Sequence, residues 1–271
     1  MGEAASEQMV GKGRVVLLGA GRVATHLVPA LVHAGYCVAQ VWSRTETSAR
    51  DLAERMDIAY TTNLDAVVDD ADIYIASVAD GALPKVAERV VARVGTAPLY
   101  IHTAGSVGME LWQKCGAVHY GILYPLQTFS KEREVDVREV SFFVEASNEE
   151  VMSSIDELAH NLSDKVYCAD SIRRARLHVA AVFACNFANA MYDVAHRLLA
   201  DEKIPFEVLL PLIDETAAKV HTLTPHDAQT GPAVRGDSVV MRSHMAALEA
   251  HEDLYAMYDL ISNYITKNKS S

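Results

Sequence analysis

Two glycines and a small residue near the start of the chain are spaced as a phosphate-binding turn requires. Residues 15–24 read Val-Val-Leu-Leu-Gly-Ala-Gly-Arg-Val-Ala, an apolar run that breaks into G-x-G-x-x-A. Gly19 permits a tight turn, Gly21 lets a pyrophosphate approach the backbone, and Ala24 allows strand and helix to pack closely. The alternative is a plain tight turn. The motif predicts dinucleotide binding at the start of a helix, with these contact residues: Gly19, Ala20, Gly21, Arg22 and Val23.

The end of the second predicted strand indicates which dinucleotide binds. An acidic residue at this position accepts hydrogen bonds from both ribose hydroxyls and selects NAD. Here the chain reads Ser43-Arg44-Thr45, and two hydroxyls with a guanidinium suit a 2′-phosphate. NADP is therefore favoured over NAD. The alternative is that Ser43 or Thr45 only caps the following helix and that Arg44 is solvated.

Small and polar residues follow two further predicted strands. The carboxyl ends of strands in an open parallel sheet border the ligand crevice. We therefore expect the cofactor to contact a set of mostly small residues at these ends: Ser77, Val78, Ala79 and Thr103. The same argument places His102, Ala104 and Gly105 beside the substrate, where a histidine can act as a general acid. A histidine hydrogen-bonded within its own loop is the alternative.

The segment Tyr124-Pro125-Leu126-Gln127-Thr128-Phe129 closes the next predicted strand. The residue before a proline is biased toward an extended conformation, so we expect an extended turn here. Tyr124 and Gln127 are predicted substrate contacts. The sequence leaves the Tyr124–Pro125 bond open as cis or trans.

A long helical pattern over residues 172–199 is apolar almost all round except for one polar stripe. His178, Cys185 and Asn189 share nearly one bearing at 3.6 residues per turn, and Asn186 lies beside them. Polar groups on an otherwise apolar helix need partners or face a site. We expect His178 and Asn186 to be catalytic, with Asn189 as a substrate contact. A hydrogen-bonded core histidine is the alternative.

The loop over residues 230–237 reads Thr-Gly-Pro-Ala-Val-Arg-Gly-Asp. Arg235 can bind a substrate carboxylate in bidentate fashion. Asp237 is placed to cap the next helix.

These residues require a scaffold of alternating strands and helices. Such an alternation predicts βαβ units, a mostly parallel doubly wound α/β sheet of the Rossmann type, and after it an all-helical domain. The expected strands cover 14–18, 36–42, 72–77, 99–103 and 118–124, with two more, 141–145 and 165–168, extending the sheet. The expected parts are a disordered N-terminus over 1–12, a nucleotide-binding domain over 13–169 and a substrate and dimerisation domain over 170–271.

Composition excludes several classes of partner. The chain has 271 residues, half of them hydrophobic, and a formal net charge of -12, which argues against nucleic acid and anionic membranes. No segment resembles a signal peptide or a membrane span. The cysteines show neither disulfide nor metal-ligand spacing: Cys37, Cys115, Cys168 and Cys185. We expect buried thiols, no metal site and a cytoplasmic protein.

Six motifs occur in a fixed order: G-x-G-x-x-A, S-R-T, H-T-A-G-S, Y-P-L-Q-T-F, H-x(7)-N and T-G-P-A-V-R-G-D. Together they resemble the Rossmann-like plus DUF2520 proteins over nearly the whole chain, a family classed with NADP oxidoreductases. That family is similar to the 6-phosphogluconate dehydrogenase-like group, which includes the F420-dependent NADP reductases. The resemblance implies an NADP-binding domain and a helical domain that commonly dimerises. Several branches of the group have a catalytic lysine on the interdomain helix, where this chain has His178.

The sequence thus predicts an NADP-dependent oxidoreductase that forms a homodimer through its C-terminal helices. A hydride passes between the nicotinamide and a carbonyl or imine carbon of a small anionic metabolite. Two alternatives stay open: an NADP-binding sensor or scaffold without catalysis, and hydride exchange between NADP and a deazaflavin.

Overall fold

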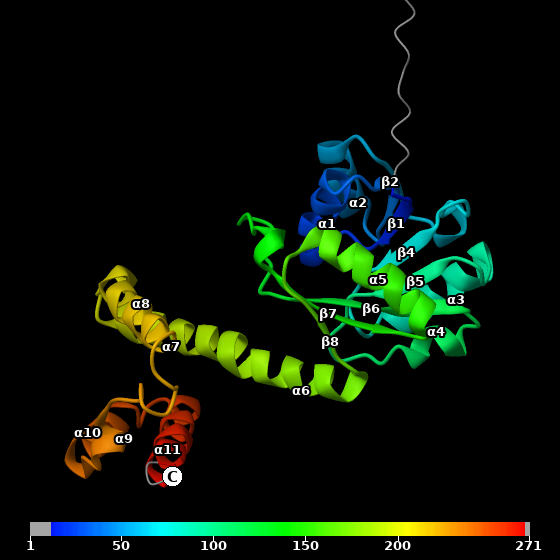
Figure 1. Cartoon of the computed structure of the whole chain (residues 1–271). Helices are drawn as coiled ribbons and strands as arrows, with labels where there is room; N and C mark the ends of the chain where they lie inside the picture. The colour runs from blue at the N-terminus through cyan, green and yellow to red at the C-terminus, as the bar shows by residue number, and fades with distance from the viewer. Residues whose placement is uncertain (1–11, 269–271) are drawn as a thin grey trace, which may run out of the picture. The chain divides into compact units, whose positions relative to one another are not determined.

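The computed structural model of the chain describes residues 12–268 and shows an eight-stranded sheet followed by helices (Figure 1). The predicted disordered N-terminus lies outside the described residues, apart from Lys12. The strand order is β3-β2-β1-β4-β5-β6-β7-β8. The first six strands have the order of a doubly wound dinucleotide-binding fold, so the predicted fold class is confirmed.

The strands are short and mostly buried. Neighbours from β3 to β6 pair in parallel, β7 pairs antiparallel to β6, and β8 pairs parallel to β7. The bounds are β1 (Arg14–Leu18), β2 (Cys37–Trp42), β3 (Ala59–Thr61), β4 (Ile73–Ala76), β5 (Leu99–His102), β6 (His119–Leu126), β7 (Ser141–Ala146) and β8 (Val166–Cys168). The strand β3 was not predicted, because it is three residues long and has no buried residue to give an apolar pattern.

Helices cover both faces of this sheet and bury a core on each. One core includes apolar residues of α1 (Arg22–His33), α2 (Glu46–Met56) and α5 (Glu149–Leu162). The other includes residues of the 3-10 turn Leu64–Ala66, α3 (Leu83–Val94) and α4 (Glu110–Lys114). A second 3-10 turn, Val137–Glu139, precedes β7. The two cores hold the carboxyl ends of β1, β2, β4 and β5 at one edge of a rigid sheet.

The predicted turn after the sixth strand is wrong. Tyr124 and Pro125 lie inside β6, which continues to Leu126 by pairing with β7. Pro125 is tolerated there because β5 pairs with β6 only as far as Ile122, so β7 is the one strand beside it. The Tyr124–Pro125 bond is trans, since the described residues contain no cis peptide.

The long helix begins and ends near the predicted positions but is not a uniform α-helix. It consists of α6 (Ser171–Ala181), a π-helical stretch Val182–Phe187 and α7 (Ala188–Asp201). A π turn holds more residues than an α turn, so bearings beyond it rotate backward relative to a continuous α-helix. The prediction that His178 and Asn189 share one polar stripe is therefore wrong. Spacing alone does not reveal a π-helical stretch.

The chain forms two compact units, which divide between Cys185 and Asn186. Strands end after Cys168, as predicted, but the first turns of the long helix belong to the sheet unit. The helical unit continues with the 3-10 turn Phe206–Leu209, α8 (Leu210–Lys219), α9 (Pro232–Arg235), α10 (Ser238–Ala247) and α11 (Glu252–Lys267). Asp237 caps α10, as predicted, by accepting the Val240 N–H at 3.2 Å.

The prediction of buried thiols is wrong. Cys37, Cys168 and Cys185 are exposed, Cys115 is half-buried, and all four are free thiols. Within residues 12–268, no helix has the length and apolar character needed to cross a membrane. The cytoplasmic location stays a prediction.

Candidate active site

The glycine turn after β1 is held between two strand ends. Gly19 has a φ of 127°, and its N–H donates to the Trp42 carbonyl oxygen at 2.7 Å. A Cβ at Gly19 would lie 2.7 Å from the Ser77 carbonyl carbon and closer still to its oxygen. Only glycine satisfies both the backbone conformation and this approach. The turn is therefore fixed against the carboxyl ends of β2 and β4.

The start of α1 suits a phosphate group. Gly21 is the N-cap residue, no described side chain caps the helix, and its first turn contains no acidic residue. Ala24 is fully buried, as the close packing of strand and helix requires. The first N–H groups of a helix have no intrahelical acceptor and attract anions. The backbone of residues 21–23 thus fits the pyrophosphate of a dinucleotide.

The Ser-Arg-Thr segment after β2 fits a 2′-phosphate. Ser43 is buried and its N–H donates to the Thr61 carbonyl oxygen at 3.2 Å, which fixes the segment at the strand end. Arg44 and Thr45 are exposed. Thr45 occupies the N-cap position of α2, but its side chain makes no capping hydrogen bond. Capping therefore does not account for the hydroxyl of Thr45, which stays available together with the guanidinium of Arg44.

The ends of β4 and β5 come together beside this turn. Ser77 is buried against Gly19, and the Thr103 N–H donates to the Ala76 carbonyl oxygen at 3.1 Å. Beyond them, the Ser106 hydroxyl donates to the Asp80 carboxylate. Val78 is half-buried and Ala79 is exposed. The predicted cofactor residues therefore form one continuous edge, although the sequence did not indicate the Ser106–Asp80 link.

His102 makes its hydrogen bonds within its own loop. Its ring has no exposed surface, Nδ1 accepts the Ala104 N–H at 3.3 Å, and Nε2 lies 3.4 Å from the Gly108 carbonyl oxygen. Burial lowers the pKa of His102 to about 4, so the ring is neutral at physiological pH. This geometry agrees with the loop-histidine alternative. Contact of His102 and Ala104 with substrate stays a prediction to which the structure adds no contact.

Tyr124 and His178 form a hydrogen-bonded pair. Tyr124 Oη lies 3.0 Å from His178 Nδ1, and the two rings meet edge to face at 68°. A Cβ at Gly105 would lie 2.7 Å from Tyr124 Cζ and 2.9 Å from His178 Nδ1. Burial raises the pKa of Tyr124, against a smaller lowering by the positive charge of Arg174. Three predicted site residues from three separate segments therefore meet at one point.

Arg174 is a further residue of this cluster and was not predicted from the sequence. It is 1% exposed and lies one turn before His178 on α6. Its guanidinium binds the Glu145 carboxylate of β7 and donates to the Val107 carbonyl oxygen at 2.7 Å and to Ser171 Oγ at 3.2 Å. Glu145 also accepts hydrogen bonds from the Ser171 N–H and hydroxyl. The spacing of four residues from Arg174 to His178 was a usable signal. The partner on β7 was not visible in the sequence.

The remaining predicted site residues are not part of the Tyr124–His178 cluster in the sheet unit. Gln127 is exposed, and its side-chain Oε1 accepts the Thr128 N–H at 2.7 Å. Asn186 and Asn189 are exposed on the helical unit, as is Arg235 at the end of α9. Their predicted roles stay predictions.

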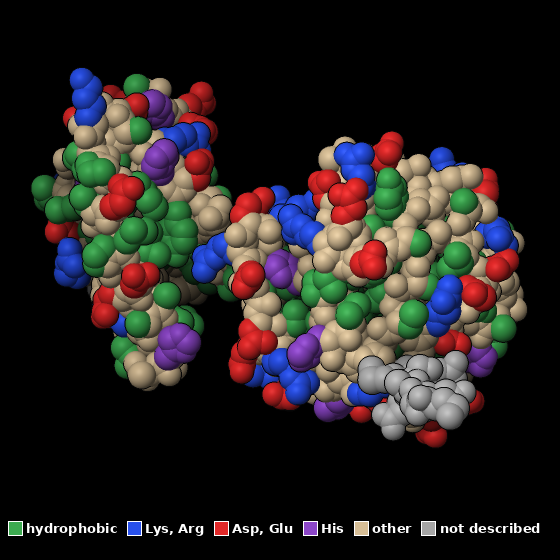
Figure 2. Space-filling view, turned by 90° about the horizontal axis from the view of Figure 1, so that it is seen from above, with side chains coloured by type: hydrophobic (Ala, Val, Ile, Leu, Met, Phe, Trp, Pro, Cys, Tyr) green, Lys and Arg blue, Asp and Glu red, His purple; other side chains and the backbone are tan. Residues whose placement is uncertain are grey.

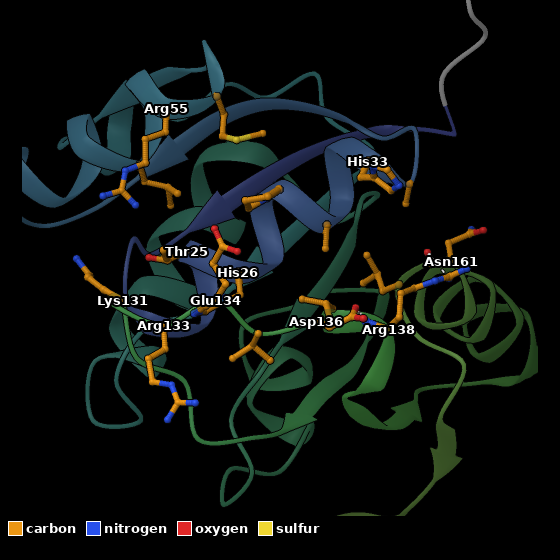
Figure 3. A pocket seen from close by; sticks show the side chains of 18 of the residues that line it. Thr25, His26, His33, Arg55, Lys131, Arg133, Glu134, Asp136, Arg138 and Asn161 are labelled. Atoms are coloured by element: carbon orange, nitrogen blue, oxygen red, sulfur yellow. Dashed lines mark hydrogen bonds between the residues drawn. The ribbon is translucent and has the colours of Figure 1, made fainter.

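The two described cavities lie elsewhere. One, of about 1050 Å³, lies in the sheet unit along α1, between α2 and residues 131–138 (Figure 3). Lys131 and Arg133 extend from its rim, and Glu134 and Asp136 belong to the same segment, so its charge is mixed. The other, of about 350 Å³, is an apolar cavity in the helical unit. Neither of these cavities is lined by Gly19, Tyr124 or His178.

Two families match the chain. Residues 14–104 match a family described as "NADP oxidoreductase coenzyme F420-dependent", and residues 140–265 match the "Domain of unknown function (DUF2520)". No curated protein matches the chain. The NADP predicted from the Ser-Arg-Thr segment agrees with the first description.

The crystal structure of a "putative NADP oxidoreductase" from Bacteroides fragilis is similar along the whole chain. It is 46% identical, the match covers 94% of this chain and 98% of that one, and the TM-score is 0.90. An imine reductase from Myxococcus stipitatus, in complex with NADP+, is 16% identical over 94% and 93% of the two chains, with a TM-score of 0.66. A 1-pyrroline-5-carboxylate reductase from Streptococcus pyogenes is 13% identical over 96% and 99%, with a TM-score of 0.62. The last two show a shared fold.

The buried ring of His102 predicts a specific acid sensitivity. Its pKa in the folded protein, about 4, lies below the reference value of 6.5, so the unfolded chain binds the proton first. The stabilisation is complete above pH 6.5 and falls as the pH drops toward 4, by about 3 kcal/mol for this one ring. His102→Asn should therefore flatten the decline in the free energy of unfolding between pH 7 and pH 4.5, as measured by urea denaturation.

Trp112→Phe is the matched control, because Trp112 is fully buried beside His102 and does not titrate. It should lower stability equally at both pH values. A His102→Asn protein that keeps the wild-type decline would show that another group causes it.

Proposed function

The chain belongs to the DUF2520 family of NADP oxidoreductases, and we propose that it transfers a hydride between NADP(H) and a carbonyl or imine carbon of a small anionic metabolite. The observation that carries this proposal is the position of the Tyr124–His178 pair. It lies at the same sheet edge as the glycine turn and the Ser-Arg-Thr segment. This position supports the proposal, because a group able to move a proton lies at the sheet edge that carries the residues suited to hold a dinucleotide.

The cofactor would be held by the residues that fit it. The N–H groups at the start of α1 bind the pyrophosphate, and Arg44 with Ser43 and Thr45 binds the 2′-phosphate. Ser77, Val78, Ala79 and Thr103 line the path along the edge. When bound, NADPH supplies the hydride. The protein's own part is to orient the two reactants and to manage the proton.

The proposed substrate class rests on two kinds of side chain: a histidine able to carry a proton and an arginine able to bind a carboxylate. His178 of the sheet unit is the proposed proton carrier. On the helical unit, Arg235 is the proposed ligand of a substrate carboxylate, and Asn186 is a proposed hydrogen-bonding group. Structures that share the fold include an imine reductase and a 1-pyrroline-5-carboxylate reductase, which supports the inclusion of imines beside carbonyl compounds.

A deazaflavin acceptor has one specific observation in its favour. The family that matches residues 14–104 is described as F420-dependent. That match covers the nucleotide-binding half and not the long helix with His178. We therefore keep deazaflavin exchange as the second candidate.

The helical unit is proposed to pair with a second copy of the chain. Apolar side chains on three of its helices are largely exposed: Leu212 on α8 at 63%, Val239 on α10 at 68% and Leu260 on α11 at 72%. Figure 2 shows hydrophobic side chains gathered over the face of this unit that is in view. Exposed apolar patches of this kind mark interaction surfaces.

Turnover tests the function. Purified protein should oxidise NADPH, followed by absorbance, with members of a panel of 2-oxo acids and carboxylated cyclic imines. His178→Ala should lower kcat by about 100-fold or more and leave NADPH affinity unchanged, because a general acid acts only on the chemical step. His160→Ala, on the exposed side of α5, is the matched control. Oxidation with a deazaflavin alone would favour the second candidate, and binding without turnover would favour an NADP sensor.

Recognition of the 2′-phosphate is tested at Arg44. Arg44→Ala should weaken NADPH binding by roughly 10-fold to 100-fold, the value of a hydrogen-bonded ion pair, and leave NADH binding unchanged. Arg50→Ala, on the helix α2 that follows this segment and paired with Glu54 at 3.9 Å, should weaken neither. Nucleotide fluorescence titration measures both constants. Equal weakening of both nucleotides would exclude Arg44 as the selective contact.

Self-association is tested by sedimentation velocity. The wild-type chain should sediment as a dimer, and Leu260→Glu should shift it toward the monomer because a buried carboxylate opposes association. Val118→Glu makes a comparable change at an exposed position of the sheet unit and should leave the dimer intact. A monomeric wild type at micromolar concentration would contradict the proposal.

A further inference from the structure

We propose that Tyr124 is the residue that gives the proton to the substrate and that His178 passes the replacement proton to Tyr124. This inference deepens the proposed function, on which it rests, and changes two of its roles. Tyr124 becomes a catalytic residue instead of a passive contact, and His178 acts through it.

The pair is built by a glycine that leaves room for it. A side chain at Gly105 would intrude on the Tyr124 ring, with Cζ at 2.7 Å and Cε2 at 2.9 Å, and on His178 Nδ1 at 2.9 Å. The backbone after β5 therefore lies directly against the hydrogen bond between β6 and α6. Only a residue without a side chain permits the contact of 3.0 Å between Tyr124 Oη and His178 Nδ1.

The position of α6 is equally fixed. Arg174, one turn before His178, is buried and binds Glu145 of β7 and the backbone of Val107. The first turns of α6 are therefore anchored on the sheet unit, and this fixes the position of His178 beside Tyr124. Proton transfer needs such a fixed position, because donor and acceptor must stay within hydrogen-bond reach.

Tyr124 has the properties of a proton donor. It is 8% exposed, and burial raises the pKa of its phenol, so the hydroxyl is protonated at neutral pH. Arg174 opposes that shift with its positive charge, which stabilises the phenolate left after donation. Asp80 acts in the other direction. The phenol is thus a stable acid with a cation near enough to stabilise its conjugate base.

His178 has the properties of a relay. His178 is half-buried, in contrast to the buried Tyr124, and is therefore the member of the pair with more solvent exposure. The charged groups that act on Tyr124 are Arg174 on α6 and Asp80 after β4. His102 does not compete for the role, because its ring nitrogens face the backbone of its own loop.

The proposed reduction balances in both protons and electrons. When the hydride reaches the carbonyl or imine carbon, the electron pair of the double bond moves to the oxygen or nitrogen. That atom takes the proton from Tyr124 Oη, so one O–H bond breaks and one bond from hydrogen to the heteroatom forms. The Nδ1–H of His178 then gives its proton to the phenolate, and a proton from solvent replaces it on the imidazole. Each turnover consumes one hydride from NADPH and one proton from solvent.

The hydrogen bond between Tyr124 and His178 is tested without cofactor or substrate. In the full chain, NMR should show a slowly exchanging Tyr124 hydroxyl proton and a His178 Nδ1 shift typical of a hydrogen-bonded nitrogen. Both signals should vanish in Tyr124→Phe and in Gly105→Ala, which keeps both side chains but inserts a methyl group between them. Tyr120→Phe, on the same strand, should leave them intact. Their absence from the wild type would overturn the pair.

The chemical role is tested with whichever panel substrate the wild type turns over. Tyr124→Phe should lower the single-turnover rate by about 100-fold or more, within the range of general acid catalysis, and leave NADPH affinity unchanged. The double variant Tyr124→Phe/His178→Gln should be no slower than Tyr124→Phe, because residues that act in series lose the same step once. Tyr120→Phe should keep the wild-type rate.

The outcomes separate the two proposals. A wild type that turns over no panel member overturns the proposed function, and the catalytic role with it, whether or not NMR shows the bond. Turnover that survives in Tyr124→Phe overturns Tyr124 as the donor and leaves the proposed function standing. Losses that multiply in the double variant overturn the relay and make His178 an independent group.

Discussion

The buried contact between Arg174 and Glu145 is the interaction on which the candidate site depends. It joins the first turns of α6 to β7 and to the loop after β5, three segments far apart in the chain. A buried charge pair is costly to form and costlier to break, by about 3–5 kcal/mol when one partner is removed. That asymmetry fixes the start of the long helix on the sheet unit, and with it the place of His178.

The same constraint explains why the compact units divide within the long helix. Ser171 and Arg174 make their hydrogen bonds with Glu145 and Val107, so the first turns of α6 pack as part of the sheet unit. The π-helical stretch Val182–Phe187 then spans the division. Departures from α geometry of this kind are frequent at functional sites.

The residues suited to bind the cofactor are positioned in a different way. Backbone groups at the strand ends and at the start of α1 provide the contacts, and the side chains there need only be absent or small. Gly19 is pressed against Ser77, and Ala24 is fully buried. The Tyr124–His178 pair depends on side chains whose positions are set by distant partners. Local spacing therefore identified the first set of residues, and the second required the packed sheet.

The sequence by itself determined the elements and the cofactor. Apolar periodicity located every strand except the short β3, and the long helix begins and ends near its predicted residues, because burial patterns and turn residues act over a few positions. G-x-G-x-x-A and Ser43-Arg44-Thr45 indicated NADP because backbone geometry and phosphate chemistry are local. Only the tertiary structure decided that Tyr124 meets His178, that His102 is confined to its loop, and that Arg174 is buried. Those facts depend on side chains brought together from β5, β6, β7 and α6, and no spacing along the chain encodes such a meeting.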